Sequence, residues 1–272
     1  MRFEEWARRA ELAEAEGKAA WFRAVPEELA ASLGLRVYRV GGASVWLTRG
    51  IDHYFANGVA ALGVMQPATR AAVGAVLAPF RQAGLPCAVD LSPIAQPVQL
   101  PRWLRAHGLA PAARDVRLWR TVDDPSSVVS DLRIRVIGPE RAAVFTDLSL
   151  AGFPAGRPLA AGLAAQVGRP EWLHYLAFDG DTSVATAALF VHEDTAWLGW
   201  AYTLPAYRGR GAQSALLARR IADAGARGCT LVVADTGEDT PEQPNPSYRN
   251  MLRLGFAHAY TKLIYRIPRA YA

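Results

Sequence analysis

Apolar and polar positions alternate along the chain with two periods, one typical of helices and the other of strands. In residues 3–22, Phe3, Trp6, Ala10 and Ala13 recur near one helical face. Short apolar runs bounded by Gly, Pro or Asp indicate strands. In the first half we expect helices at 3–22, 26–34, 68–83 and 100–107, and strands at 35–40, 43–48, 54–64, 87–91 and 116–122.

The pattern starts again after a polar, turn-forming segment at residues 123–127, with the sequence Asp-Asp-Pro-Ser-Ser. We therefore predict a domain at 1–122, a linker at 123–130 and a second domain at 131–272. In the second domain we expect strands at 132–137, 172–178, 183–191, 197–203, 230–234 and 260–267, and helices at 139–151, 159–167, 212–227 and 248–254.

The two halves are similar to each other in the order of their elements. Residues 103–110 align with residues 251–257: each segment has a short helix, a glycine, an apolar residue and the start of a last strand. A strand, a helix and a strand precede each copy. Two ordinary α/β segments can agree in this way by chance, but order and spacing together favour an internal repeat.

Composition excludes some classes of protein and leaves others open. The chain has 272 residues, of which 51% are hydrophobic and 20% are charged, so it can bury a core and is not a disordered chain. Its 30 Lys and Arg against 25 Asp and Glu make a net charge of +5. This mild excess suits an anionic small ligand as well as it suits nucleic acid.

Cysteine, histidine and hydropathy patterns narrow the picture further. Cys87 and Cys229 lie in apolar surroundings, which argues against a disulfide framework and favours small buried side chains. The five His are scattered without metal-ligand spacing, so no metal site is expected. The chain has no apolar run of membrane-spanning length, and its first residues include Glu4 and Glu5. We expect a soluble, cytoplasmic protein without a membrane partner.

One segment carries recognisable chemistry. Arg208-Gly209-Arg210-Gly211 lies between a strand that ends at Thr203 and a helix that begins at Ala212. Glycines allow a tight turn and a close approach of the backbone to a ligand. The first amide groups of a helix have no intrahelical acceptor and carry the positive end of its dipole. With two arginines and the Ser214 hydroxyl, this segment predicts a pyrophosphate site.

Other interpretations of this segment remain open. Neither a Walker loop nor a dinucleotide-binding fingerprint is present. A basic surface turn is the plain alternative, although the flanking strand and amphipathic helix favour a phosphate loop. An RNA-binding arginine–glycine patch is a further alternative, but such patches are usually repeated and disordered.

The segment resembles the acetyl-CoA loop of the GNAT N-acetyltransferase superfamily. The loop pattern, [QR]xxGx[GA], matches residues 208–213 except that Gln213 stands in the last position. The closing family signature, a short helix followed by Gly-Phe and a strand, matches residues 250–256, and the resemblance covers about 132–271. The first half has Val64-Met-Gln-Pro-Ala-Thr in place of the loop. The whole chain is therefore similar to a tandem GNAT protein with a degenerate N-terminal copy.

The resemblance implies an α/β (α+β) fold of two tandem GNAT-like domains. Each would be a mixed, mostly antiparallel sheet flanked by helices, with a splayed parallel strand pair in the second. Acetyl-CoA would lie between strands 197–203 and 230–234. The implied cofactor-binding residues are Ala201, Tyr202, Thr203, Arg208, Gly209, Arg210, Gly211, Ala212, Gln213, Ser214, Asn245, Ser247 and Asn250. Helix capping explains Asn245 or Ser247 equally well.

The catalytic assignment departs from the family pattern at one position. The family often has a Tyr four residues before the closing Gly, where this chain has Met251. Tyr248, one helical turn earlier, is the candidate acid for the leaving thiolate. Asp235 and Glu238 are the candidate bases for the attacking amine. Packing explains Tyr248 equally well, and solvated loop charges explain Asp235 and Glu238.

The resemblance implies an acetyl-CoA-dependent N-acetyltransferase that acts on a primary amine of a small molecule or protein by direct attack. We expect a monomer or homodimer that binds no nucleic acid. The alternatives are a module that binds acyl-CoA without turnover and an RNA-binding protein. Trp172 and the 153–158 segment are candidates for the acceptor site. Strand alternation puts Trp200 and Tyr202 on one face and Ala201 and Thr203 on the other.

Overall fold

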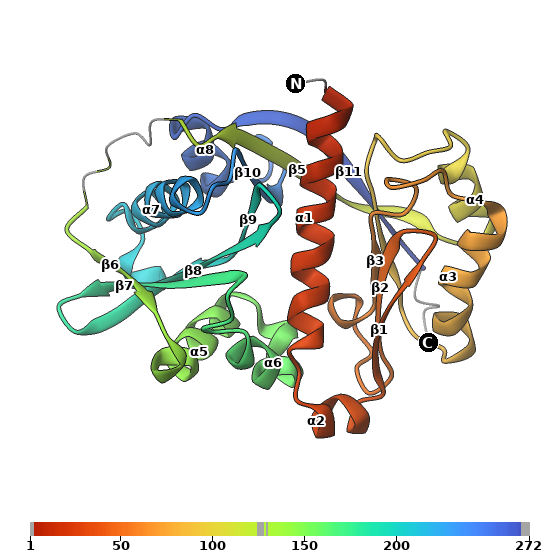
Figure 1. The fold of residues 1–272 in the computed structure, drawn as a ribbon, viewed down its shortest axis with the longest axis horizontal. Coiled ribbons are helices and arrows are strands. Elements are labelled where there is room, and N and C mark those ends of the chain that lie inside the picture. The colour runs from red at the N-terminus through yellow and green to blue at the C-terminus, as the bar shows by residue number, and fades with distance from the viewer. Residues whose placement is uncertain (1–2, 124–127, 129, 268–272) are drawn as a thin grey trace. The chain divides into compact units, whose positions relative to one another are not determined.

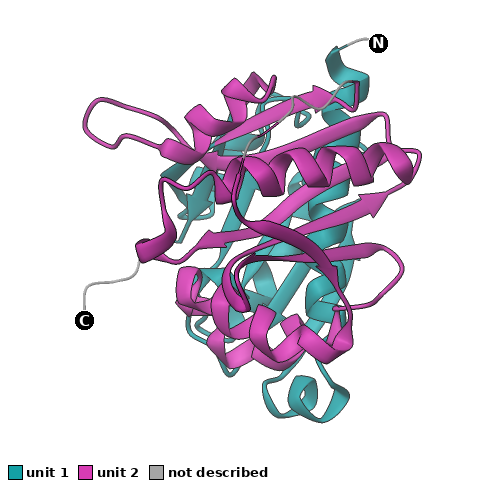
Figure 2. Cartoon of the chain, turned by 90° about the vertical axis from the view of Figure 1, so that its left-hand side faces the viewer, with its two compact units in different colours: residues 1–115, 261–272 teal, residues 116–260 magenta. Residues whose placement is uncertain are grey.

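The computed structural model describes residues 3–123, 128 and 130–267. The chain divides into two compact units, drawn in different colours in Figure 2. Unit 1 comprises Met1–Asp115 and Thr261–Ala272, and unit 2 comprises Val116–Tyr260. The domain boundaries expected from the sequence stay a prediction. Of the expected linker, residues 124–127 and 129 lie outside the described residues.

Unit 1 contains a sheet with the strand order β1-β2-β3-β4-β11 (Figure 1). Its strands are β1 (Leu35–Val40), β2 (Ala43–Thr48), β3 (Gly58–Ala60), β4 (Ala88–Leu91) and the second part of β11 (Ala257–Arg266). Its helices are α1 (Phe3–Arg23), α2 (Glu27–Ser32), α3 (Arg70–Gln82) and α4 (Leu100–Ala106), with a 3-10 turn η1 (Tyr54–Ala56).

The strand expected at 54–64 is only partly correct. Residues Tyr54–Ala56 form a 3-10 turn because Nδ1 of His53 accepts a hydrogen bond from the backbone N–H of Phe55. After β3, positive φ angles at Ala61 (59°) and Gly63 (75°) turn the chain away from the sheet. β1, β2, β4, α3 and α4 form close to their expected positions, and their apolar residues pack on one core.

Unit 2 contains the strand order β5-β10-β9-β8-β7-β6. Its strands are β5 (Ala110–Thr121, shared with unit 1), β6 (Arg133–Ile137), β7 (Trp172–Asp179), β8 (Thr182–His192), β9 (Thr195–Thr203) and β10 (Leu231–Gly237). Its helices are α5 (Ala142–Gly152), α6 (Ala160–Ala165), α7 (Ala212–Ala226) and α8 (Pro246–Arg253). The 3-10 turns are η2 (Pro139–Arg141), η3 (Pro154–Leu159) and η4 (Pro205–Tyr207).

The two faces of the unit 2 sheet pack against different helices. One face meets the apolar side of α7, where Leu217 and Ile221 are fully buried in the main core. The other face carries Trp172 and His174, and the His174 ring contacts Phe145 of α5 edge-to-face. At about 25 cal/mol per Å² of buried apolar surface, burial on both faces is the main stabilising contribution to the sheet.

The two units repeat one order of elements. In unit 1, antiparallel β1, β2 and β3 lead through α3 to β4, which pairs with β3 in parallel. In unit 2, antiparallel β7, β8 and β9 lead through α7 to β10, which pairs with β9 in parallel. The predicted fold class is confirmed. Within the described residues, no helix is both long and apolar enough to cross a membrane.

Candidate functional site

The parallel pair in unit 2 opens at one end. β9 and β10 pair over only four residues, from Thr195 with Leu231 to Leu198 with Ala234. Beyond that point β9 continues to Thr203 and β10 continues to Gly237. The predicted splayed pair is therefore present, and the backbone of β9 presents an open edge where the strands part.

A β-bulge lies in β9 at the start of this opening. The register with β8 shifts between Thr186 and Ala188, opposite Trp200 and Ala201. Trp200 has a positive φ of 51°, which is uncommon for a bulky residue and needs support from its surroundings. That support includes the buried Thr186 hydroxyl, which donates to the Trp200 carbonyl at 3.0 Å. Bulges of this kind often lie next to active sites because they redirect the backbone.

The glycine-rich segment after β9 forms an exposed helix start. Gly209 and Gly211 have φ values of 82° and 76°, in the left-handed region that glycine adopts without strain. Gly211 is the N-cap of α7, and no described side chain caps the helix there. The backbone amides of Ala212, Gln213 and Ser214 thus precede the first intrahelical bond, from Ala215 N–H to Gly211 O. An added Cβ at Gly209 would meet no described atom within 4 Å, so this corner has room for a ligand.

The two arginines of the loop have different environments. Arg210 donates to both oxygens of Asp179 at 2.7 and 3.1 Å, and also pairs with Asp131. The hydrogen bonds to these carboxylates raise the pKa of Arg210 above its ordinary value. Its charge is balanced by the protein, so Arg210 anchors the loop. Arg208 is exposed, with Nε 3.4 Å from the Thr203 carbonyl, and its charge is available to a phosphate.

Gln213 links α7 to α8. Its Nε2 donates to the Ser247 hydroxyl at 2.6 Å, and its Oε1 accepts from Asn250 Nδ2 at 2.6 Å. These three predicted cofactor residues therefore lie together beside the start of α7. Gln213, the departure from the family loop pattern, serves as a bridge between the two helices.

Asn245 has a structural role that accounts for both ends of its amide. Its Oδ1 accepts from the N–H groups of Ser247 and Tyr248 at 3.0 and 3.2 Å, which caps α8. Its Nδ2 donates to the Thr236 hydroxyl and the Gly237 carbonyl, which ties the helix to the end of β10. The capping explanation therefore describes its observed contacts.

Asp235 lies one residue beyond the last β9–β10 pair. Its Oδ2 accepts from Arg117 at 2.9 Å and from the Trp197 indole at 3.3 Å. The Arg117 side chain is fully buried and that of Asp235 is 15% exposed. A carboxylate held this way is well oriented by the buried guanidinium. Glu238 follows the last residue of β10 and lies further along the same segment.

Tyr248 lies in the first turn of α8, with its hydroxyl 3.3 Å from Nδ1 of His258. Its ring is partly buried against the main core of unit 2. Met251, in the position where the family often has Tyr, is buried in that core at 5% exposure and has no proton to donate. Tyr248, paired with His258, therefore supplies the phenolic hydroxyl of this helix.

An aromatic surface follows β9 on the α5 face. The Trp200 ring meets Phe153 edge-to-face at 5.5 Å, and an added Cβ at Gly152 would collide with the Tyr202 ring. Ala201 packs against the core on the α7 face of the sheet. The predicted alternation of Trp200 and Tyr202 against Ala201 is confirmed.

Four of these contact residues were not identified from the sequence. Arg117 lies in a strand of mixed polarity, so the neighbouring residues in the sequence do not indicate that its side chain is buried beside Asp235. His258 follows the closing Gly-Phe motif by two residues, and that spacing was its only signal. Asp131 and Asp179 are far from the loop in sequence and reach Arg210 only in the folded unit.

The segment that builds the site matches a known family model. Residues 146–256 match the model of the acetyltransferase (GNAT) family, and the segment includes β9, the glycine loop, α7 and β10. This segment is therefore similar to a GNAT acetyltransferase domain, and the similarity supports acyl transfer in general. No curated protein matches the chain.

Solved structures extend the similarity of fold to both halves. A GCN5-related N-acetyltransferase from Kribbella flavida has a TM-score of 0.65 at 20% identity, over 96% of each chain. A tandem GNAT protein from the clavulanic acid biosynthesis pathway has a TM-score of 0.58 at 14% identity, over 93% of this chain and 95% of its own. The predicted tandem arrangement with a degenerate first copy agrees with these folds.

Proposed function

We propose that this protein is an acetyl-CoA-dependent N-acetyltransferase that transfers the acetyl group to a primary amine of a small molecule or protein. The observation that carries the proposal is the opening between β9 and β10 beside an uncapped, glycine-turned helix start. An extended pantetheine arm can pair with an open strand edge, and a pyrophosphate suits helix amides. The family match over residues 146–256 supports the same chemistry.

The residues present suit the CoA substrate in three places. The edge of β9 at Ala201, Tyr202 and Thr203 would pair with the pantetheine arm. The amides of residues 212–214 and the side chain of Arg208 would hold the pyrophosphate. Ser247 and Asn250 would lie beside the arm, held in place by Gln213.

The transfer itself needs one base and one acid. The amine nitrogen attacks the thioester carbon, the C–S bond breaks, the amine loses a proton and the departing sulfur gains one. Tyr248 is the proposed acid, and His258 can return a proton to its hydroxyl. Asp235 and Glu238 are the two candidate bases, acting directly or through water. A backbone N–H of β9 would polarise the carbonyl oxygen.

Asp235 also suits recognition of the amine before it reacts. Its carboxylate is fixed at the point where the strands part, beside the Trp197 indole. A carboxylate next to an aromatic side chain favours a cationic group. We propose that Asp235 orients the incoming ammonium, whereas Glu238 is the more suitable proton acceptor, because Asp235 is held by Arg117.

The test is release of CoA thiol from acetyl-CoA over a panel of primary amines, with CoA binding measured in parallel. Tyr248→Phe should lower kcat by about 10²–10⁴-fold while CoA binds as in the wild type. Tyr207→Phe, in the turn before the loop, is a matched control that should keep full activity. Equal activity of Tyr248→Phe and the control would remove Tyr248 from the mechanism.

The second candidate function is binding of acyl-CoA without turnover. The buried Met251 favours it, because the helix lacks the hydroxyl that the family often has there. Tight CoA binding without thiol release from any amine would support this function and exclude the enzyme. Failure to bind CoA would exclude both.

A further inference from the structure

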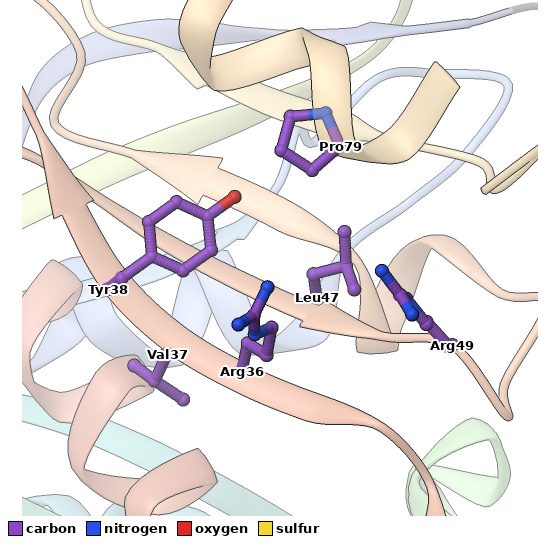
Figure 3. A pocket seen from close by; sticks show the side chains of 6 residues that line it. All are labelled: Arg36, Val37, Tyr38, Leu47, Arg49 and Pro79. Atoms are coloured by element: carbon purple, nitrogen blue, oxygen red, sulfur yellow. The ribbon is translucent and has the colours of Figure 1, made fainter. Parts of the chain in front are cut away.

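A pocket in unit 1 has no part in the proposed reaction. It has a volume of about 550 Å³ and is lined by Arg36, Val37, Tyr38, Leu47, Arg49 and Pro79 (Figure 3). Ligand pockets for small organic molecules have volumes of about 300–1,000 Å³. The pocket is therefore of a suitable size for an organic molecule.

The hairpin of β1 and β2 places the polar groups of this pocket together. Arg36 and Tyr38 are two residues apart on β1, so their side chains share a face. Leu47 pairs with Arg36 across the hairpin, and Arg49 follows two residues later. Pro79 of α3 closes one side. Figure 3 shows Arg36, Arg49 and the Tyr38 hydroxyl turned toward the same space.

The charges of the pocket are unbalanced. No Asp or Glu lines it. In the part of the chain that the structure describes, neither Arg36 nor Arg49 forms an ion pair. Arg39, on the opposite face of β1, is paired with Glu16. Two guanidinium groups in one hollow repel each other, and an anion placed between them removes that cost.

Tyr38 adds a directed hydrogen-bond donor. Its hydroxyl oxygen is buried and makes no hydrogen bond within the described structure. An unsatisfied buried hydroxyl carries a desolvation cost, which a hydrogen bond to a ligand oxygen would recover. Burial raises the pKa of Tyr38, while the nearby Arg36 opposes the shift, so the hydroxyl keeps its proton at neutral pH.

We propose that this pocket binds a small organic anion. Its phosphate or carboxylate group would lie between Arg36 and Arg49 and accept from the Tyr38 hydroxyl. Its apolar part would rest on Leu47 and Pro79. Planar guanidinium groups bind both kinds of anion in a bidentate manner. Unit 1 thus has a ligand site of its own, independent of the proposed acetyl transfer.

The experiment is calorimetric titration of the full chain with phenyl phosphate and with benzoate, which separate the two kinds of anion. Benzyl alcohol is the neutral probe and inorganic phosphate is the probe without an apolar part. We expect at least one organic anion to bind saturably and more tightly than either comparison probe. Binding of neither organic anion would overturn the proposal. Equal binding of benzyl alcohol or inorganic phosphate would also overturn it.

Substitutions inside and outside the pocket test where the organic anion binds. Arg36→Gln and Arg49→Gln should each weaken binding by about tenfold, the value of one charge-assisted hydrogen bond. Arg39→Gln removes the same charge from the opposite face of β1 and should leave affinity unchanged. Gly211→Val in unit 2 should also leave it unchanged. Equal loss in Arg39→Gln, or loss in Gly211→Val, would place the binding elsewhere and overturn the proposal.

Tyr38→Phe tests the third contact without changing charge. We expect a smaller loss of affinity than for either arginine variant, because a neutral hydrogen bond contributes less than a charged one. A nuclear magnetic resonance spectrum of each variant shows whether unit 1 is folded. Unchanged affinity in all three folded pocket variants would overturn the proposal.

Discussion

The helices that follow β9 and β3 begin in contrasting ways, although the two units share an order of elements. α7 begins after Gly211, and no described side chain caps it. α3 begins after Thr69, whose hydroxyl accepts from the N–H of Ala72 at 3.0 Å. The first amides of a helix either bind a cap from the protein or remain available to a ligand. Unit 1 has the first arrangement and unit 2 has the second.

The loops before these helices also differ in the space beside them, which protein backbone fills in unit 1 but not in unit 2. In unit 1, Gln96 N–H donates to Gly63 O and Gln96 O accepts from Ala68 N–H, both at 2.8 Å. A Cβ on Gly63 would lie 2.4 Å from the Gln96 oxygen. Backbone of the same unit fills the space beside the loop, whereas Gly209 in unit 2 has open space. A repeated fold can therefore lose a ligand site by satisfying its own amides, while its strands stay paired.

The largest expected effect comes from Gly211→Val in the uncapped loop. A branched side chain at a φ of 76° is strained, and it moves the amides that we assign to the pyrophosphate. Loss of several charged hydrogen bonds predicts weakening of CoA binding by at least about a thousandfold.

Calorimetry with CoA measures that loss, and Gly84→Val is the matched control. Gly84 also has a positive φ, 64°, and an added Cβ there has open space, but it ends α3 in unit 1. Near-normal CoA affinity in Gly211→Val, or an equal loss in the control, would contradict the assignment.

The second expected effect is a pH dependence of stability that comes from a buried histidine of unit 2. Burial lowers the pKa of His174 in unit 2 from 6.5 to about 3, whereas in unit 1 His53 is exposed and the pKa of the half-buried His107 is lowered by burial and by the nearby Arg81. Below pH 6.5 the unfolded chain binds a proton that the folded chain does not. The free energy of unfolding should therefore decrease as the pH is lowered below 6.5, by about 3 kcal/mol over roughly two pH units.

His174→Phe is the test, because a phenyl ring can pack on Phe145 and Trp172 without titrating. Urea unfolding between neutral and acid pH should show a shallower loss of stability in this variant than in the wild type. Identical pH profiles would show that His174 is not the group responsible.

A smaller effect distinguishes the two loop arginines. Arg208→Gln should weaken CoA binding by about tenfold at low salt and less at high salt, since its exposed charge is screened. Arg210→Gln and Asp179→Asn both remove the Arg210–Asp179 ion pair, and Arg210→Gln also removes the pair with Asp131. Each should weaken CoA binding by up to about fivefold, and the double variant should weaken it no more than Arg210→Gln alone. Additive losses in the double variant would mean that Arg210 contacts the phosphate itself.

The smallest effect tests the capped loop of unit 1. Thr69→Ala removes the α3 cap and should lower the free energy of unfolding by about 1 kcal/mol. CoA affinity should stay the same, because these amides serve no ligand. Chemical unfolding and calorimetry measure the two quantities, and a change in CoA affinity would show that unit 1 takes part in cofactor binding.

Local patterns in the sequence were sufficient for most elements. The apolar period of α7 and the glycines at 209 and 211 predicted a phosphate-type loop, and the structure has that loop with both glycines at positive φ. The strand expected at 54–64 was too long, because a histidine-capped turn at 54–56 has little apolar signal. Elements driven by local spacing were thus predictable, and those driven by one side-chain hydrogen bond were not.

The sequence by itself determined the order of helices and strands, the repeat and the position of the glycine loop, because these depend on residues close together in the chain. Tertiary structure decided which charges remain available. Arg208 and Arg210 look alike in sequence, but Asp131 and Asp179 neutralise only Arg210. Likewise, Arg117 reaches Asp235 across 118 positions. Such pairings depend on strand order and burial, so folding alone assigns each charge to a structural or a chemical role.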